Sequence, residues 1–141
     1  YDSETNTISG TPTTVGSYEV TIVSTDESGN TTETTFTITV EDTTAPVVDS
    51  VEDQITEVNT PIEDVTLNGQ DNSGQPVTHE VSGLPVGVTY DSETNTISGT
   101  PTTVGSYDVT VVTTDESGNK TETTFTITVE DTTAPDVDPV D

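Results

Sequence analysis

The stretch "GSYDVTVVTTDESGNKTETTFTITVE" (residues 105–130) decides the fold, because apolar and polar side chains alternate along both of its halves. Successive side chains of a β-strand point to opposite faces, so residues two apart share a face. The run "DESGN" between the halves consists mostly of residues that favour turns. The stretch therefore predicts a hairpin of two long strands with one apolar face. The apolar sets are Tyr107, Val109 and Val111 on the first strand and Phe125, Ile127 and Val129 on the second.

The chain contains an internal repeat. Residues 1–46 return as residues 90–135, at an offset of 89 residues and with four substitutions. We call these segments the first copy and the second copy. Near-identical tandem copies are typical of an array in which each repeat stacks on the next. The substitutions are Glu19 to Asp108, Ile22 to Val111, Ser24 to Thr113 and Thr31 to Lys120.

Each copy closes with the phrase "VEDTTAP", whose Ala-Pro marks a boundary between repeats. Proline lacks the N–H that a strand ladder needs, and it favours extended backbone in the residue before it. We therefore predict that residues 47–135 form one complete repeat. Residues 1–46 are then the C-terminal half of a preceding repeat, and residues 136–141 begin the next one.

Turn signals recur at short intervals along the complete repeat, which predicts an all-β sandwich of about seven strands. The intervening runs are rich in Thr, Val and Ile, which fit a pleated, half-buried surface. The predicted strands are residues 51–57, 62–67, 76–81, 94–98, 105–114 and 121–130, with a further short one near residues 86–90.

The charge of the chain excludes several functions. The 141 residues include 27 acids and a single Lys or Arg, which gives a formal net charge of −26. Such a surface repels nucleic-acid phosphates and anionic lipid headgroups, so we predict neither nucleic-acid binding nor membrane-surface binding. The sequence contains no apolar run of about 18 residues, so we predict no membrane-spanning segment within it. Mutual repulsion of the acids is expected to keep an array extended and soluble.

Four phrases within residues 83–129 carry a family resemblance: Leu-Pro-x-Gly-Val-x-Tyr-Asp, Thr-Ile-Ser-Gly-Thr-Pro, Gly-x-Tyr-x-Val-Thr-Val and Thr-Asp-x-x-Gly-Asn. The segment resembles the immunoglobulin-like, or dystroglycan-type cadherin-like, repeats of bacterial surface adhesins. The resemblance implies an immunoglobulin-like (cadherin-like) β-sandwich in tandem repeat. It also implies an extracellular position on the surface of a bacterium, anchored to the cell wall, in stalks like those of biofilm-associated proteins.

The function that the resemblance implies is a structural stalk, which extends a distal region from the cell and has neighbouring repeats of the same chain as its partners. The alternative is an adhesive module that binds a host ligand or associates with a like repeat on another cell, as in a biofilm. An adhesive repeat should gain avidity with copy number, whereas a stalk repeat should not. The half-repeat of residues 1–46 would alone expose apolar side chains and strand edges, which predicts either homotypic contacts between chains or completion within a longer array.

The wider resemblance to cadherins implies a calcium site at the joints between repeats. Glu41 and Asp42 stand where the acidic cadherin linker would be, Asp71 and Asn72 open a loop "DNSG", and Asp115 follows a strand end. Calcium takes six to eight oxygen ligands at about 2.3–2.6 Å. The linker has threonines where cadherins have Asn and Asp, and the segment "GTPTTVG" carries no acid, so we predict one weak Ca²⁺ site with a dissociation constant of roughly 10⁻⁴ to 10⁻³ M. The alternative is that these acids only form turns.

Two other groups are weak candidates for chemistry. His79 is the only histidine, and transition-metal sites need several nitrogen or sulfur ligands, so we predict an ordinary strand residue. Acid pairs such as Asp91 and Glu93 suggest glycoside hydrolysis only if one acid lies in an apolar pocket across a sugar cleft. In a chain this acidic such pairs arise by chance, and aromatic residues are few. We therefore predict that the protein is not an enzyme.

Overall fold

The computed structural model describes residues 1–140, which form two compact units, residues 1–43 and residues 44–140. We call them the first unit and the second unit and describe each by itself. The elements of the described residues are β-strands joined by turns. Within residues 1–140 no helix has the length and apolar character needed to cross a membrane.

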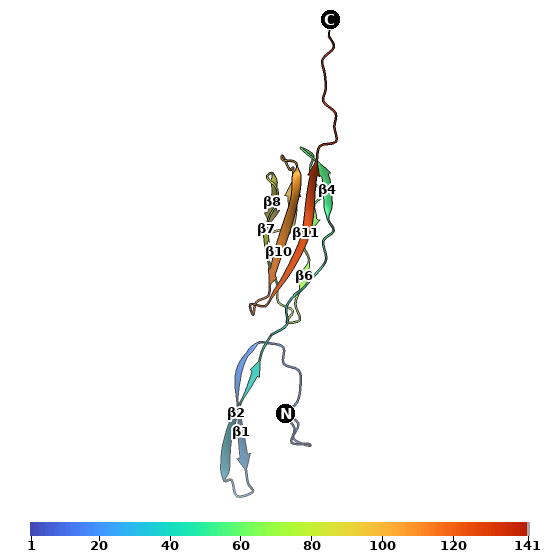
Figure 1. Cartoon of the computed structure of the whole chain (residues 1–141). Helices are drawn as coiled ribbons and strands as arrows, with labels where there is room; N and C mark the ends of the chain where they lie inside the picture. The colour runs from blue at the N-terminus through green and yellow to red at the C-terminus, as the bar shows by residue number, and fades with distance from the viewer. Residues whose placement is uncertain (141) are drawn as a thin grey trace. The chain divides into compact units, whose positions relative to one another are not determined.

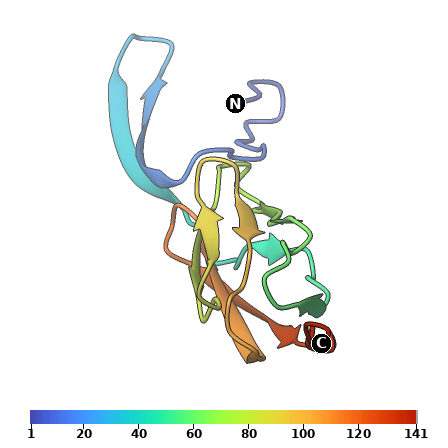
Figure 2. The ribbon, with the colours of Figure 1, turned by 90° about the horizontal axis from the view of Figure 1, so that it is seen from above.

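The first unit is a β-hairpin preceded by a turn segment. Strands β1 (Gly16–Thr25) and β2 (Thr31–Val40) pair antiparallel, with Gly16 opposite Val40 and Thr25 opposite Thr31. The two strands lie side by side in both views (Figures 1 and 2). Ahead of the hairpin, an isolated antiparallel bridge joins Asp2 to Thr7.

The second unit contains two main sheets. One has the order β4 (Gln54–Glu57), β11 (Lys120–Glu130), β10 (Gly105–Thr114) and β7 (Thr78–Ser82), in which only the β4–β11 pair is parallel (Figure 1). The other has the order β5 (Val65–Thr66), β9 (Thr96–Gly99) and β8 (Val88–Asp91). A two-residue ladder joins β3 (Val47–Val48) to β6 (Gly69–Gln70).

The core of the second unit lies between these two sheets. The apolar side chains predicted for one face of the long hairpin are buried: Val109, Val111, Phe125, Ile127 and Val129 are each at most 3% exposed. Tyr107 is partly buried and packs against them. The prediction of an immunoglobulin-like β-sandwich is confirmed. The rest of the core cluster comes from the other sheet and the segments beside it, namely Ile62, Val65, Leu67, Val88 and Ile97.

The long strands were predicted better than the short ones. Strand β10 has the predicted bounds, and β11 begins one residue earlier than predicted. The predicted strands of residues 51–57 and 62–67 shorten to β4 and β5. The ladder of β3 and β6 was missed, because a two-residue strand is too short to show a period in the sequence.

Candidate functional sites

A buried acid closes the turn between β10 and β11. Asp115 is 5% exposed, and its two carboxylate oxygens accept hydrogen bonds from the backbone N–H and the side-chain amide of Asn119, both at 2.8 Å. The backbone N–H of Asp115 donates to the carbonyl oxygen of Asn119 at 3.0 Å. These bonds hold the carboxylate in one orientation at the end of the sandwich.

A second acid lies close to Asp115. Asp71 follows β6, and its Oδ2 atom accepts hydrogen bonds from the backbone N–H of Ser73 at 3.0 Å and from the Ser73 hydroxyl. One carboxylate oxygen of Asp71 and one of Asp115 lie within 4.8 Å of each other. Two oxygens that bind the same Ca²⁺ at 2.3–2.6 Å are at most about 5 Å apart, and a carboxylate oxygen has two lone pairs. The spacing and the donor chemistry therefore fit one shared hard cation.

The chain enters the second unit at this same end of the sandwich. Pro46 is buried, and its carbonyl oxygen accepts a hydrogen bond from the hydroxyl of Thr121, near the start of β11. Val47 then pairs with Gln70, the residue before Asp71. The first residues of the second unit are thus fixed beside the strands that lead to Asp71 and Asp115.

The five residues predicted as calcium ligands fall into three groups. The structure brings Asp71 and Asp115 together. Asn72, in the same loop as Asp71, has an exposed side chain. Glu41 and Asp42 belong to the first unit, four or five residues ahead of Pro46 in the sequence.

A site that the sequence did not reveal holds the chain where it leaves the sandwich. Glu57, the last residue of β4, accepts hydrogen bonds from the backbone N–H of Thr132 at 2.7 Å, the Thr132 hydroxyl at 2.8 Å and the Thr133 hydroxyl at 3.1 Å. The N–H of Thr132, and next its hydroxyl, hold the pKa of Glu57 below its ordinary value. The threonines of the second "VEDTTAP" phrase thus attach the outgoing linker to its own repeat.

Sequence reasoning missed Glu57 because its partners lie 75 and 76 residues away. No local pattern links residues at that distance. The available signal was the recurrence of two threonines in the linker phrase, where a solvated spacer would need no particular residue.

His79 is a strand residue, as predicted. It lies in β7, half-buried, with its Nδ1 atom 2.7 Å from the hydroxyl oxygen of Thr113, which is fully buried. Burial lowers the pKa of His79, because a charged imidazolium is poorly solvated there. The neutral ring is therefore the form that the fold favours.

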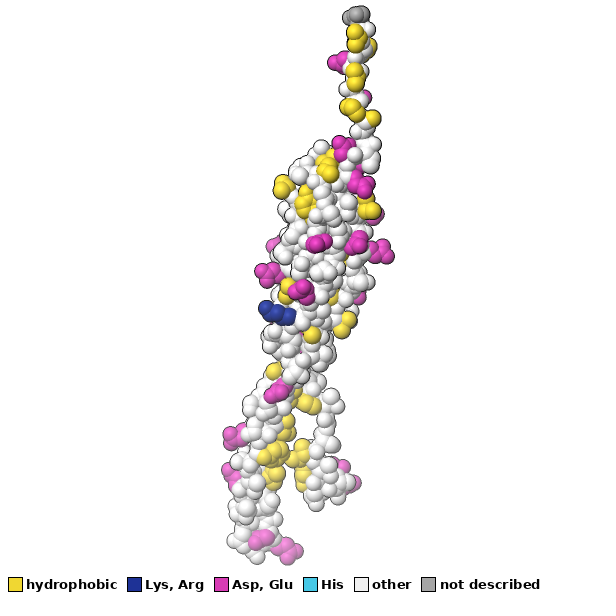
Figure 3. Space-filling model, in the orientation of Figure 1, with side chains coloured by type: hydrophobic (Ala, Val, Ile, Leu, Met, Phe, Trp, Pro, Cys, Tyr) yellow, Lys and Arg dark blue, Asp and Glu magenta, His cyan; other side chains and the backbone are white. Residues whose placement is uncertain are grey.

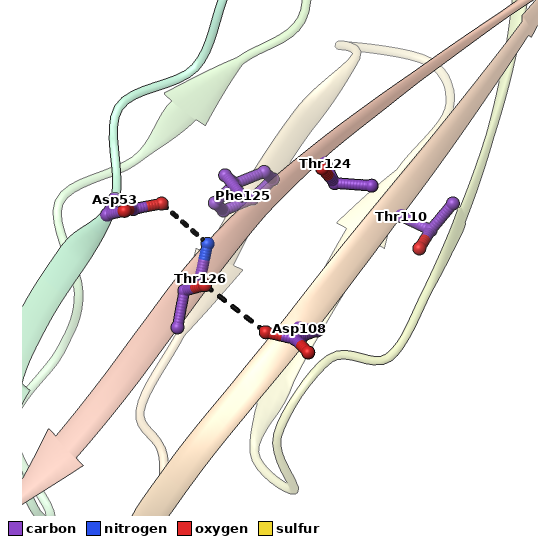
Figure 4. A pocket seen from close by; sticks show the side chains of 6 residues that line it. All are labelled: Asp53, Asp108, Thr110, Thr124, Phe125 and Thr126. Atoms are coloured by element: carbon purple, nitrogen blue, oxygen red, sulfur yellow. Dashed lines mark hydrogen bonds between the residues drawn. The ribbon is translucent and has the colours of Figure 1, made fainter.

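A shallow polar pocket lies on the sheet of β10 and β11 (Figure 4). Asp53 accepts a hydrogen bond from the backbone N–H of Thr126 at 2.8 Å, and Asp108 accepts one from the Thr126 hydroxyl at 3.2 Å. Asp53 directly precedes β4, so its bond helps to align that strand beside β11. The pocket is lined by Asp53, Asp108, Thr110, Thr124, Phe125 and Thr126.

The sheet order, the shared core and the long hairpin define an immunoglobulin-like β-sandwich module. The model of the family described as "Putative Ig domain" matches residues 1–41 and 43–130. The chain belongs to this family, and the match includes most of both copies of the repeat.

Comparison with known proteins points to surface adhesins. The chain is 58% identical over 125 residues to the "Serine-rich adhesin for platelets" of Staphylococcus aureus strain MRSA252. The alignment covers 89% of this chain and 9% of that protein. The chain therefore spans less than a tenth of the length of this relative. A solved structure of a Bacteroides fragilis protein described as a "putative alpha-galactosidase" aligns with a TM-score of 0.51 at 24% identity. The alignment spans 64% of this chain and 19% of that one, and it shows a likeness of fold alone. Protocadherin gammaB7 aligns over 81% of this chain and 33% of its own at 19% identity, with a TM-score of 0.47.

Proposed function

We propose that the protein is a stalk segment of an extracellular bacterial surface adhesin, in which tandem immunoglobulin-like sandwiches extend a distal region from the cell wall. The observation that carries the proposal is the attachment of the outgoing linker by Glu57 through three hydrogen bonds. A linker held against its own repeat starts the next repeat from a defined position, which stiffens an array. The family, the adhesin relative and the internal copy at 89 residues support the same function.

The surface suits an extended extracellular rod. Acidic side chains are scattered along both units, and one basic side chain is visible among them (Figure 3). Repulsion between like charges opposes collapse of neighbouring repeats onto each other, and salt screens it beyond about 8 Å at physiological ionic strength.

We also infer a non-enzymatic role. The Asp91 carboxylate accepts a hydrogen bond from the backbone N–H of Glu93 at 2.9 Å, and both side chains are exposed, so this acid pair forms a turn. A hydrolytic acid would need an apolar environment to raise its pKa. The likeness of fold to the "putative alpha-galactosidase" structure says nothing of activity, because unrelated functions occur on one fold.

The linker attachment is tested by comparing Glu57→Gln with Glu63→Gln, a matched loss of charge at an exposed acid. Glu57→Gln is expected to accelerate hydrogen exchange at the amide of Thr132 by roughly tenfold, because a charge-assisted bond is lost. Glu63→Gln should leave that amide unchanged. Equal exchange in the two variants and the parent chain would contradict the attachment.

Acid should release the linker in the parent chain. The pKa of Glu57 is lowered in the folded state, so its contribution is present above the ordinary glutamate pKa and is lost as the pH falls through the lower, folded value. In an array of several repeats, small-angle X-ray scattering should then show a shorter maximum dimension. This change should be absent from an array that carries Glu57→Gln in every repeat.

We further propose that one Ca²⁺ stiffens each joint. Asp71 and Asp115 supply the two carboxylates that the structure places within 4.8 Å, and Asn72 lies in the same loop as Asp71. Asp42 lies four positions ahead of Pro46 in the sequence, a length of chain that spans up to roughly 13 Å. The linker carboxylates of Glu41 and Asp42 are therefore the proposed source of the remaining protein ligands.

Calcium binding is tested by thermal melts in chelator, in millimolar Ca²⁺ and in millimolar Mg²⁺. At a calcium concentration ten times the dissociation constant, binding should stabilise the second unit by about 1.4 kcal/mol, a rise of several degrees in Tm. Asp115→Asn should abolish the calcium-dependent rise. Asp26→Asn is the matched control, because Asp26 makes the same turn hydrogen bonds in the first copy. An equal rise with Mg²⁺, or a rise that survives Asp115→Asn, would contradict the site.

A further inference from the structure

Strands β4 and β11 bring the two ends of the second unit side by side. The chain enters this unit at Pro46 and soon forms β4, and it leaves the unit from the end of β11. The two strands are parallel, with Gln54 opposite Ile127 and Glu57 opposite Glu130 (Figure 1). The entering segment and the leaving strand of one repeat are therefore neighbours in one sheet.

Hydrogen bonds between these two segments continue on both sides of β4. Before the strand, the carboxylate of Asp53 accepts a bond from the backbone N–H of Thr126 at 2.8 Å. After the strand, the backbone N–H of Val58 donates to the carbonyl oxygen of Glu130 at 2.7 Å. Hydrogen bonds to the entering segment thus follow β11 from Thr126 to Glu130.

The register shows which N–H groups of β4 face β11. Alternate residues of a strand direct their backbone groups to the same side of the strand within the sheet. The N–H of Val58 faces β11, so the N–H of Thr56 faces β11 as well. The N–H of Ile55 points the other way, and that side is the free edge of the sheet. Thr56 and Ile55 are therefore adjacent residues of which only one donates to the ladder.

Side chains hold β4 in place along β11. Val51 lies before β4 and Val58 after it, and both pack against the buried core. On β11, Phe125, Ile127 and Val129 belong to that core. A displacement of β4 along β11 would therefore break the ladder and also move Val51 and Val58 away from their apolar partners.

Tension along an array of repeats would act on the two strands in opposite directions. The entering chain would pull β4 back toward Pro46, and the outgoing linker would pull β11 forward toward Thr132. Parallel strands that are pulled in this way slide past each other, so all the hydrogen bonds between them stretch together. Pulling from one end would instead break the bonds one after another. Forced unfolding is governed by the rate of crossing the unfolding barrier, so simultaneous breakage resists a higher force.

We propose that the pair of β4 and β11 is a mechanical clamp, which keeps the repeat folded while tension passes along the chain. The clamp consists of the β4–β11 ladder with the flanking bonds of Asp53 and Val58. This further function rests on the proposed stalk, because a stalk under tension is what needs such a clamp. Strand β10, the other neighbour of β11, is antiparallel to it and follows from the interior of the repeat, so it does not join the two ends.

The contacts at the point of entry are expected to yield before the clamp. They are the single hydrogen bond from Thr121 to the Pro46 carbonyl and the two-residue ladder of β3 and β6. Both come ahead of β4 along the entering chain. Their rupture would lengthen the entering segment and leave the β4–β11 ladder intact.

Single-molecule force spectroscopy on the full chain tests the dependence on direction. The chain has no cysteine, so handles attach only where cysteines are introduced. Ala45→Cys with Ala134→Cys pulls the two strands past each other, whereas Thr60→Cys with Ala134→Cys pulls at the leaving end and peels β4 from β11. All three positions are exposed. The force that unfolds the second unit should be higher in the sliding direction by about twofold or more, because the bonds then break together.

Two adjacent proline substitutions test whether the ladder carries the force. Thr56→Pro removes an N–H that faces β11, and it should lower the sliding force to about the peeling force. Ile55→Pro is the matched control, because proline is tolerated where the N–H faces a free edge, and it should keep the higher sliding force. Asp53→Ala removes only the bond to Thr126 and should lower the sliding force by a smaller amount. This milder variant keeps the test decisive if Thr56→Pro does not fold.

Equal unfolding forces in the two directions would overturn the clamp. Equal losses of sliding force in Thr56→Pro and Ile55→Pro would also overturn it, as would an unchanged sliding force in Asp53→Ala. The linker attachment is tested separately, because Glu57→Gln removes the charge that holds the linker and leaves the ladder intact. If Glu57→Gln does not change hydrogen exchange at Thr132 but the sliding force is high, the linker attachment fails and the clamp stands.

Discussion

The chain folds the same hairpin twice, once with a sandwich around it and once without. The register is the same in both copies: Gly16 pairs with Val40, and Gly105 pairs with Val129. The tyrosine hydroxyl of each copy donates to a backbone carbonyl four residues earlier, at 2.9 Å for Tyr18 and 2.8 Å for Tyr107. Local sequence is therefore sufficient to set strand pairing and turn geometry.

The two copies differ in how far their apolar side chains are buried. The apolar face is closed in the second unit and open in the first, although the side chains are almost the same. Residues 96–99 form β9, whereas the identical residues 7–10 form no strand. The two units therefore separate what the hairpin forms alone from what packing against residues 47–89 adds.

We expect the largest effect on stability from removing the aromatic ring of the buried Phe125. Phe125→Ala should lower the free energy of unfolding of the second unit by about 3–5 kcal/mol, because it leaves a cavity in a closed core. Phe36→Ala should cost much less, since that ring is already 39% exposed. Urea unfolding followed by the amide NMR signals of each unit measures both. Equal losses would mean that the first unit has a core of its own.

A glycine pair tests close backbone packing. Gly99 and Gly10 have positive φ of 134° and 140°, so alanine is strained at both. A Cβ atom at Gly99 would collide with the carbonyl oxygen of Gly87, whereas one at Gly10 would meet nothing within 4 Å. We expect Gly99→Ala to cost the second unit about 3 kcal/mol and Gly10→Ala about 1 kcal/mol in thermal melts. A larger effect at Gly10 would refute this account of the packing.

The side-chain amides of Asn30 and Asn119 each donate a hydrogen bond to the aspartate of their own turn, so we expect effects in both copies. Asn119→Ala removes the side-chain amide bond to the buried Asp115, although the backbone N–H of residue 119 can still donate, and it should cost the second unit about 1 kcal/mol. In the first copy, the side chain of Asn30 is the main cause that lowers the pKa of Asp26, so Asn30→Ala should raise that pKa toward its ordinary value. A carboxyl-carbon NMR titration detects the change. An unchanged titration of Asp26 would show that the turn does not depend on this amide.

The smallest expected effect is the pH response of His79. Burial lowers its pKa in the folded state, so the unfolded chain binds more protons as the pH falls below the ordinary histidine pKa. The stability of the second unit should therefore fall between about pH 7 and 5 by an amount that His79→Gln removes. Subtracting the free energy of unfolding of the variant from that of the parent chain at each pH separates this contribution from that of the many carboxylates. A parent-minus-variant stability that falls as the pH rises from about 5 to 7 would have the wrong sign for a buried neutral ring.

The success of the sequence predictions followed the distance over which each interaction acts. Alternation in β10 and β11 and the "DESGN" turn depend on neighbours within a few residues, so their bounds could be predicted closely. The loops of Asp71 and Asp115 could be predicted as ligand loops from the resemblance to cadherins. Only the fold shows that a carboxylate oxygen of Asp71 lies within 4.8 Å of one of Asp115. The role of Glu57 could not be predicted, because its partner Thr132 lies 75 residues away in the sequence.

The sequence by itself determined the hairpin, its register, its turns and the repeat of 89 residues, because backbone preference and side-chain alternation act locally. The tertiary structure alone decided which copy of the apolar face is buried, which identical segment becomes a strand, and which acid holds the linker. Each of these outcomes needs a partner from a distant part of the chain. Burial is a property of that partnership and not of the residues that are buried.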